Sequence, residues 1–115
     1  MLLSKADIIG AQDIAKELVP VPEWGGDIYV IALSERERDR LLKSLTKEGK
    51  VSVDDIRSRW CAYCIVDESG QRLFIEEADI EALAAKSAIA IDRVFAAVER
   101  MNALSSKAVD ELKKA

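Results

Sequence analysis

The turn at residues 22–26 (Pro-Glu-Trp-Gly-Gly) constrains the fold of this chain more than any other segment. Proline cannot donate a backbone hydrogen bond and glycine tolerates positive φ, so together they favour a tight connection. An alternating pattern follows in residues 28–33, which is typical of a strand. We therefore predict an antiparallel hairpin in which residues 16–21 pair with residues 28–33, with the aromatic Trp24 at its tip.

Serine residues predict one helix on either side of this hairpin. Ser4 is followed three residues later by Asp7, which favours a short capped helix. Ser34 and Glu37 form a capping box, in which the hydroxyl accepts from the Glu37 amide and the Glu37 side chain reaches back. The helix that starts there is expected to run to about residue 48, where Gly49 would close it.

The second half of the chain is predicted to be mainly helical. A helix capped by Ser52 or Asp54 should end at Tyr63 or Cys64. The other expected elements are a small hairpin of residues 63–66 and 71–74, helices at residues 76–85 and 87–101, and a last helix that begins at Ser105 or Ser106. Together these elements predict an α+β fold: one mostly helical domain over residues 1–115 with one or two small antiparallel β-hairpins.

Length and charge narrow the classes of protein that fit. A chain of 115 residues suits one domain, and its 21 acidic and 17 basic residues are interspersed and give a net charge of −4. This pattern argues against nucleic acid as the main partner. No apolar run approaches the roughly 20 residues of a membrane span, and the first residues do not resemble a secretory signal. We therefore expect a cytoplasmic protein that does not enter a membrane.

The chain is not expected to be an enzyme or to bind a cofactor or metal. It contains no histidine, the commonest general base and a common zinc ligand. Cys61 and Cys64 have the spacing of a redox pair or half a zinc site, but no second such pair exists. The pair also closes a predicted helix, whereas a reactive pair is expected at a helix start. Buried, unreactive thiols are the favoured interpretation.

Two surfaces are candidates for binding a partner. Trp24 in the turn either folds back onto the core or serves as an exposed contact residue. The helix at residues 87–101 is apolar over more than one stripe, so it is either buried on two sides or docks a partner helix. Its candidate contact residues are Ile91, Phe95, Val98 and Met101.

Basic residues recur along the helix that starts after Ser34. Arg36, Arg40, Lys43 and Lys47 fall on one face, interleaved with acidic residues. A solvated helix face is the commoner explanation. The alternative is a small acidic regulatory or adaptor domain that binds a protein or nucleic acid through this face.

Several segments, taken in order, resemble the tail assembly chaperones of long-tailed bacteriophages and prophages. They are residues 2–8, 19–26, 33–39, 66–74 and 92–95. The resemblance implies a non-enzymatic protein that coats the helical tape measure protein, brings up tail tube protein and is absent from the finished virion. It implies the host cytoplasm as the location. Many weakly bound copies along one long client would act by avidity, and self-association of the chaperone is a further expected contact.

Overall fold

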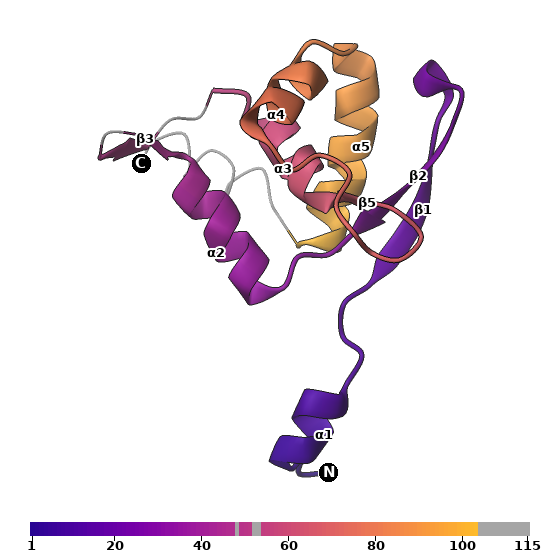
Figure 1. The fold of residues 1–115 in the computed structure, drawn as a ribbon. Coiled ribbons are helices and arrows are strands. Elements are labelled where there is room, and N and C mark those ends of the chain that lie inside the picture. Colours follow the sequence, from indigo (N-terminus) through magenta and orange to yellow (C-terminus); the bar gives the residue numbers. More distant parts are fainter. Residues whose placement is uncertain (48, 52–53, 104–115) are drawn as a thin grey trace.

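The computed structural model describes residues 1–47, 49–51 and 54–103, and these residues form an α+β protein (Figure 1). Its helices are α1 (Lys5–Gly10), α2 (Glu35–Ser44), α3 (Ile56–Cys64), α4 (Glu77–Ala84) and α5 (Ala88–Met101), together with the short 3₁₀ turn η1 (Pro22–Trp24). Its strands are β1 (Lys16–Val21), β2 (Gly26–Ile31), β3 (Thr46–Lys47), β4 (Lys50–Val51) and β5 (Ile65–Val66). The predicted fold class is confirmed.

The first hairpin forms as predicted, with a shifted second strand. β1 and β2 are antiparallel, and Lys16 lies opposite Ile31 while Val21 lies opposite Gly26. β2 begins two residues earlier than expected because η1 and Gly25, at a φ of +77°, complete the reversal of the chain. The tip therefore needs fewer residues than the proline and glycine signals suggested.

The predicted second hairpin is largely replaced by a three-stranded sheet. β5 pairs with β2, so that the strand order is β1-β2-β5 and Tyr29 lies opposite Val66. Only an isolated bridge between Val66 and Arg72 remains of the expected pairing with residues 71–74. The reason is that two strands alone are marginal, whereas the free edge of β2 offers β5 a longer partner.

The predicted end of α2 at Gly49 is wrong. The helix ends at Ser44, and Gly49 lies between β3 and β4 with a φ of +78°. A residue that closes a helix and a residue in a tight turn both require positive φ, so the glycine signal was compatible with either. The N-cap of α3 is Asp55 rather than Asp54, and the alternative Ser52 lies outside the described residues.

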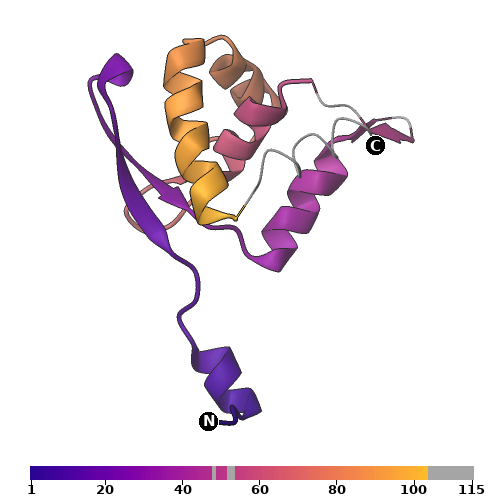
Figure 2. The same cartoon turned by 180° about the vertical axis from the view of Figure 1, so that it is seen from behind.

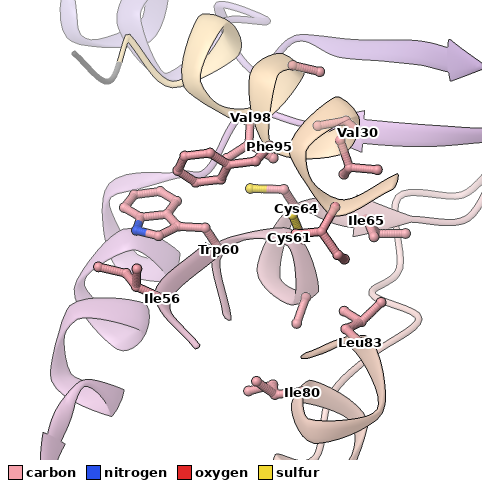
Figure 3. Packing of buried hydrophobic residues seen from close by; sticks show 14 of the residues in the cluster. Val30, Ile56, Trp60, Cys61, Cys64, Ile65, Ile80, Leu83, Phe95 and Val98 are labelled. Atoms are coloured by element: carbon pink, nitrogen blue, oxygen red, sulfur yellow. The ribbon is translucent and has the colours of Figure 1, made fainter. Parts of the chain in front are cut away.

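The core forms where α5 lies between α3 and the β1–β2 hairpin (Figures 1 and 2). Trp60 of α3 faces Phe95 of α5 in Figure 3, and both are buried together with Val30 of β2. Two ion pairs, Arg93 with Glu23 and Arg100 with Glu17, join α5 to the hairpin. The helix at residues 76–85 is confirmed as α4, which packs on α3.

The short helix expected at Ser4 is confirmed, but it stands apart from the rest of the molecule. None of the residues of α1 is buried, and Figures 1 and 2 both show it projecting from the body. The last predicted helix, at Ser105 or Ser106, lies outside the described residues.

Candidate functional site

The contact residues predicted on α5 lie in the core. Ile91, Phe95 and Val98 are 6%, 4% and 0% exposed, and Met101 is half-buried against the same cluster. α5 is therefore buried on two sides, which was one of the two interpretations of its wide apolar surface. A partner could reach the buried side chains of Ile91, Phe95 and Val98 only if α3 or the hairpin moved away.

Trp24 also folds back toward the core. Its side chain is half-buried and packs against the core cluster. Next to it, Arg93 of α5 donates to both carboxylate oxygens of Glu23 at 3.0 and 2.9 Å. This hydrogen bonding by Arg93 lowers the pKa of the Glu23 carboxyl below its ordinary value. The tip of the hairpin is thus held against α5.

The exposed apolar side chains gather instead in residues 1–13, which we call the N-terminal arm. Leu2 is 97% exposed and Ile9 is 73% exposed, and Leu3 and Ile8 are also more than half exposed. Side chains of this kind are costly to leave in water when they cluster. The arm is therefore the best candidate for a surface that another polypeptide covers.

Local hydrogen bonds give the arm its helical shape. The Ser4 amide donates to Asp7 Oδ2 at 3.0 Å, and the Asp7 amide donates to Ser4 Oγ at 3.2 Å. These contacts lower the pKa of Asp7, mainly through the bond from the Ser4 backbone. Leu3 and Ile8 occupy the N′ and N4 positions relative to the Ser4 cap, the positions at which apolar residues are often found at a helix start. The sequence thus favours a helix here even though nothing in the described part of the chain packs on it.

A groove of about 400 Å³ opens at the base of the arm, and we call it the basal groove. It lies where the end of β2, the start of α2, the end of α3 and the loop after β5 meet. Its apolar lining is provided by Ile14, Ile31, Leu33, Tyr63, Val66 and Ile75. Its rim carries Ile75, which is 62% exposed.

Arg72 shapes one wall of the basal groove. Its guanidinium lies 3.9 Å from the centre of the Tyr63 ring and donates to the Phe74 carbonyl at 2.6 Å and the Ala62 carbonyl at 3.3 Å. On the α2 side, Arg40 pairs with Glu37 at 2.6 Å. The groove therefore combines an apolar floor with charged walls, as surfaces that bind peptides often do.

The paired thiols lie in the interior of the protein. Cys61 and Cys64 are buried and free, at the end of α3. Burial raises the pKa of Cys64 to about 12 and raises that of Cys61 further, so neither forms a thiolate near neutral pH. Among the described residues, no three acidic, cysteine or histidine side chains are placed to hold a metal ion. No helix in the described ranges is both long and apolar enough to span a bilayer.

The basic stripe is shorter than predicted. Arg36, Arg40 and Lys43 are exposed on α2, but Lys47 lies in β3, beyond the end of the helix. Acidic Glu35 and Asp39 share the same stretch of surface. This mixture favours a solvated face over a phosphate-binding surface.

The arm and the basal groove were not identified from the sequence. Apolar pairs at residues 2–3 and 8–9 flank the Ser4 cap, and this was the available signal for the arm. The groove had none, because its lining residues come from four separated segments.

The described residues thus form a small α+β protein with a projecting apolar arm. No family model matches the chain, and neither a curated protein nor a solved structure matches it.

Proposed function

We propose that this protein is a tail assembly chaperone of a long-tailed phage or prophage. It binds the tape measure protein in the host cytoplasm, helps to recruit tail tube protein, and leaves before the virion is complete. It catalyses no reaction. The ordered sequence resemblance supports the identity of the client, and the exposed apolar arm supports this mode of action.

The arm is the observation that carries the proposal. A tape measure protein is long and helical, and its amphipathic helices would aggregate if their apolar faces stayed in water. A short helix with aliphatic side chains on it can cover such a face by side-chain packing. Ile8 and Ile9 are the best placed contacts, because α1 presents both to solvent.

Two features of the body agree with a non-catalytic role. The thiols that could have supported redox chemistry are buried with raised pKa values. The net charge of −4 keeps a small protein soluble while it carries apolar surface.

Co-expression with the tape measure protein of the same genome tests the proposal. We expect the client to be more soluble with the wild-type chain and to copurify with it. The double variant Ile8→Asp, Ile9→Asp should lose both effects. The matched control is Ile89→Asp, which changes an isoleucine that is 66% exposed on α5 and should behave as wild type.

Equal client solubility with and without this chain, and no copurifying complex, would contradict the proposal. Salt-sensitive binding of duplex DNA through Arg36 and Lys43 would favour the adaptor alternative, since phosphate contacts weaken steeply with salt.

A further inference from the structure

We infer that, without a client, the N-terminal arm of one copy lies in the basal groove of a second copy, whose own arm fills the first groove. This exchange goes beyond the proposed function. It is argued from the geometry of the arm and the groove and does not depend on the identity of the client. The occupant of the groove is thus a second copy of this chain.

The apolar side chains of the arm are expected to be buried by another surface. α1 has six residues, and isolated helices shorter than about 12 residues are marginal in water. Its capping contacts fix its ends, yet none of its residues is buried. A capped helix that the described part of its own chain leaves uncovered is expected to pack on another surface.

The basal groove suits the arm in its size and in its apolar lining. Its floor is aliphatic and aromatic, and its volume of about 400 Å³ leaves room for aliphatic side chains such as those of Ile8 and Ile9. Its charged lining residues are Glu37, Arg40 and Arg72, with a net side-chain charge of +1. The arm carries the charges of Lys5, Asp7, Asp13 and the Met1 ammonium group, which balance. No net charge of the arm therefore opposes its contact with the groove.

Residues 11–15 link the arm to the body, and their conformation leaves the arm free to reach a second copy. The Ala15 carbonyl accepts from the Ala32 amide at 2.9 Å, which fixes the end of the link beside the groove. Ala11 is extended, with φ −69° and ψ 135°, and no glycine or proline lies between Ala11 and Ala15 to reverse the chain. The arm therefore projects from the body, as both views show (Figures 1 and 2), and does not fold back on it.

The buried area is adequate for a dimer when the exchange is reciprocal. Each fully buried aliphatic side chain removes on the order of 100 Å² of apolar surface from water. Leu2, Leu3, Ile8 and Ile9 from two arms, with the surface that they cover, give on the order of 1,000 to 2,000 Å². This range includes the usual size of a stable interface, and a two-fold exchange closes without forming fibres.

Analytical ultracentrifugation of the full chain over the micromolar range tests the exchange. We expect wild type to dimerise. Ile8→Asp in the arm and Ile75→Asp in the groove should each raise the dimer dissociation constant by about tenfold or more. Ile89→Asp should leave it unchanged. All three changes are at exposed positions, and circular dichroism checks that the fold is retained.

A mixing experiment identifies the two surfaces. The arm variant keeps an intact groove and the groove variant keeps an intact arm, so their mixture should form a heterodimer more readily than either variant self-associates. A wild-type monomer at every concentration, including one whose arm folds onto its own groove, would overturn the inference. A dimer that persists in Ile75→Asp would overturn it as well. Client solubility with Ile75→Asp, which retains the arm, is measured separately and tests only the proposed function.

Discussion

At the C-terminal end of α5, the side chain of Asn102 joins three parts of the fold. Its Oδ1 accepts from the Leu33 amide at 2.8 Å, and its Nδ2 donates to the Val98 carbonyl at 2.9 Å and to Cys64 Sγ at 3.7 Å. Asn102 thus holds the segment after β2 against the ends of α3 and α5. One amide does this because it has both donor and acceptor atoms.

Asn102→Ala should destabilise the protein by about 2 kcal/mol, because it leaves the Leu33 amide without its partner in a half-buried place. Urea denaturation monitored by fluorescence measures the change. Gln12→Ala, which removes an exposed amide from the arm, is the control and should stay within about 0.5 kcal/mol of wild type. A similar loss in both variants would contradict this role for Asn102.

The thiols of Cys61 and Cys64 provide a second prediction at this scale. Both should react with a disulfide reagent at mildly alkaline pH only as fast as the protein unfolds, because burial raises the pKa of each thiol. The reaction is followed by absorbance in increasing urea. Rapid modification of either cysteine in the native protein would show that α3 does not bury the pair as described.

Among elements, the β1–β2 hairpin is held on α5 from both ends. Glu17 accepts from Arg100 at 2.8 Å, and Glu23 accepts from Arg93 near the tip. Because the pKa of Glu23 is lowered in the folded state, its pair contributes stability above the ordinary carboxyl pKa and loses it as the pH falls through the lowered value.

Acidification should therefore loosen the hairpin tip before the core unfolds. Acrylamide quenching of Trp24 fluorescence is expected to rise as the pH falls below the ordinary pKa of glutamate, while the buried Trp60 gives a constant background. Glu23→Gln should show strong quenching at every pH. Identical pH profiles for this variant and wild type would mean that the ion pair does not hold the tip.

α3 and α4 are joined by an ion pair in which one side chain is buried and the other is exposed. The side chain of Arg59 is 5% exposed and donates to both carboxylate oxygens of Glu77, whose side chain is 65% exposed. Glu77→Gln should cost about 1 to 2 kcal/mol, a value reduced by solvent screening, because a buried guanidinium loses its counter-charge. Arg59→Met should cost less, since it removes the buried charge and keeps the bulk. Urea denaturation of the two variants gives the ranking, and the reverse order would refute this explanation.

For the whole molecule, the separation of arm and body has a direct consequence. A variant that lacks residues 1–10 should have the melting temperature of the full chain in dilute solution, because no residue of α1 is buried. At high protein concentration the full chain should melt at a higher temperature than the truncated one, since association stabilises the folded state by mass action. Calorimetry at both concentrations tests this. A lower melting temperature of the dilute truncated chain would show that the arm packs on its own body.

Local signals in the sequence predicted much of the fold. The Ser4 and Ser34 caps, the first hairpin and the helix at residues 87–101 all form, because each depends on hydrogen bonds or periodicity within a few residues. The Ser34 box is only half made: the hydroxyl accepts from the Glu37 amide, but the Glu37 side chain pairs with Arg40 instead of reaching back.

By itself the sequence predicted the fold class, the starts of α1, α2 and α5, and the burial of the two thiols. Only the tertiary structure decided that β5 pairs with β2 and that α5 packs between α3 and the β1–β2 hairpin. It also decided that no described residue buries any part of α1. An apolar stripe in the sequence indicates that a surface is buried, but it does not indicate which element buries it. That choice depends on contacts between residues far apart in the chain, and these leave no local pattern to read.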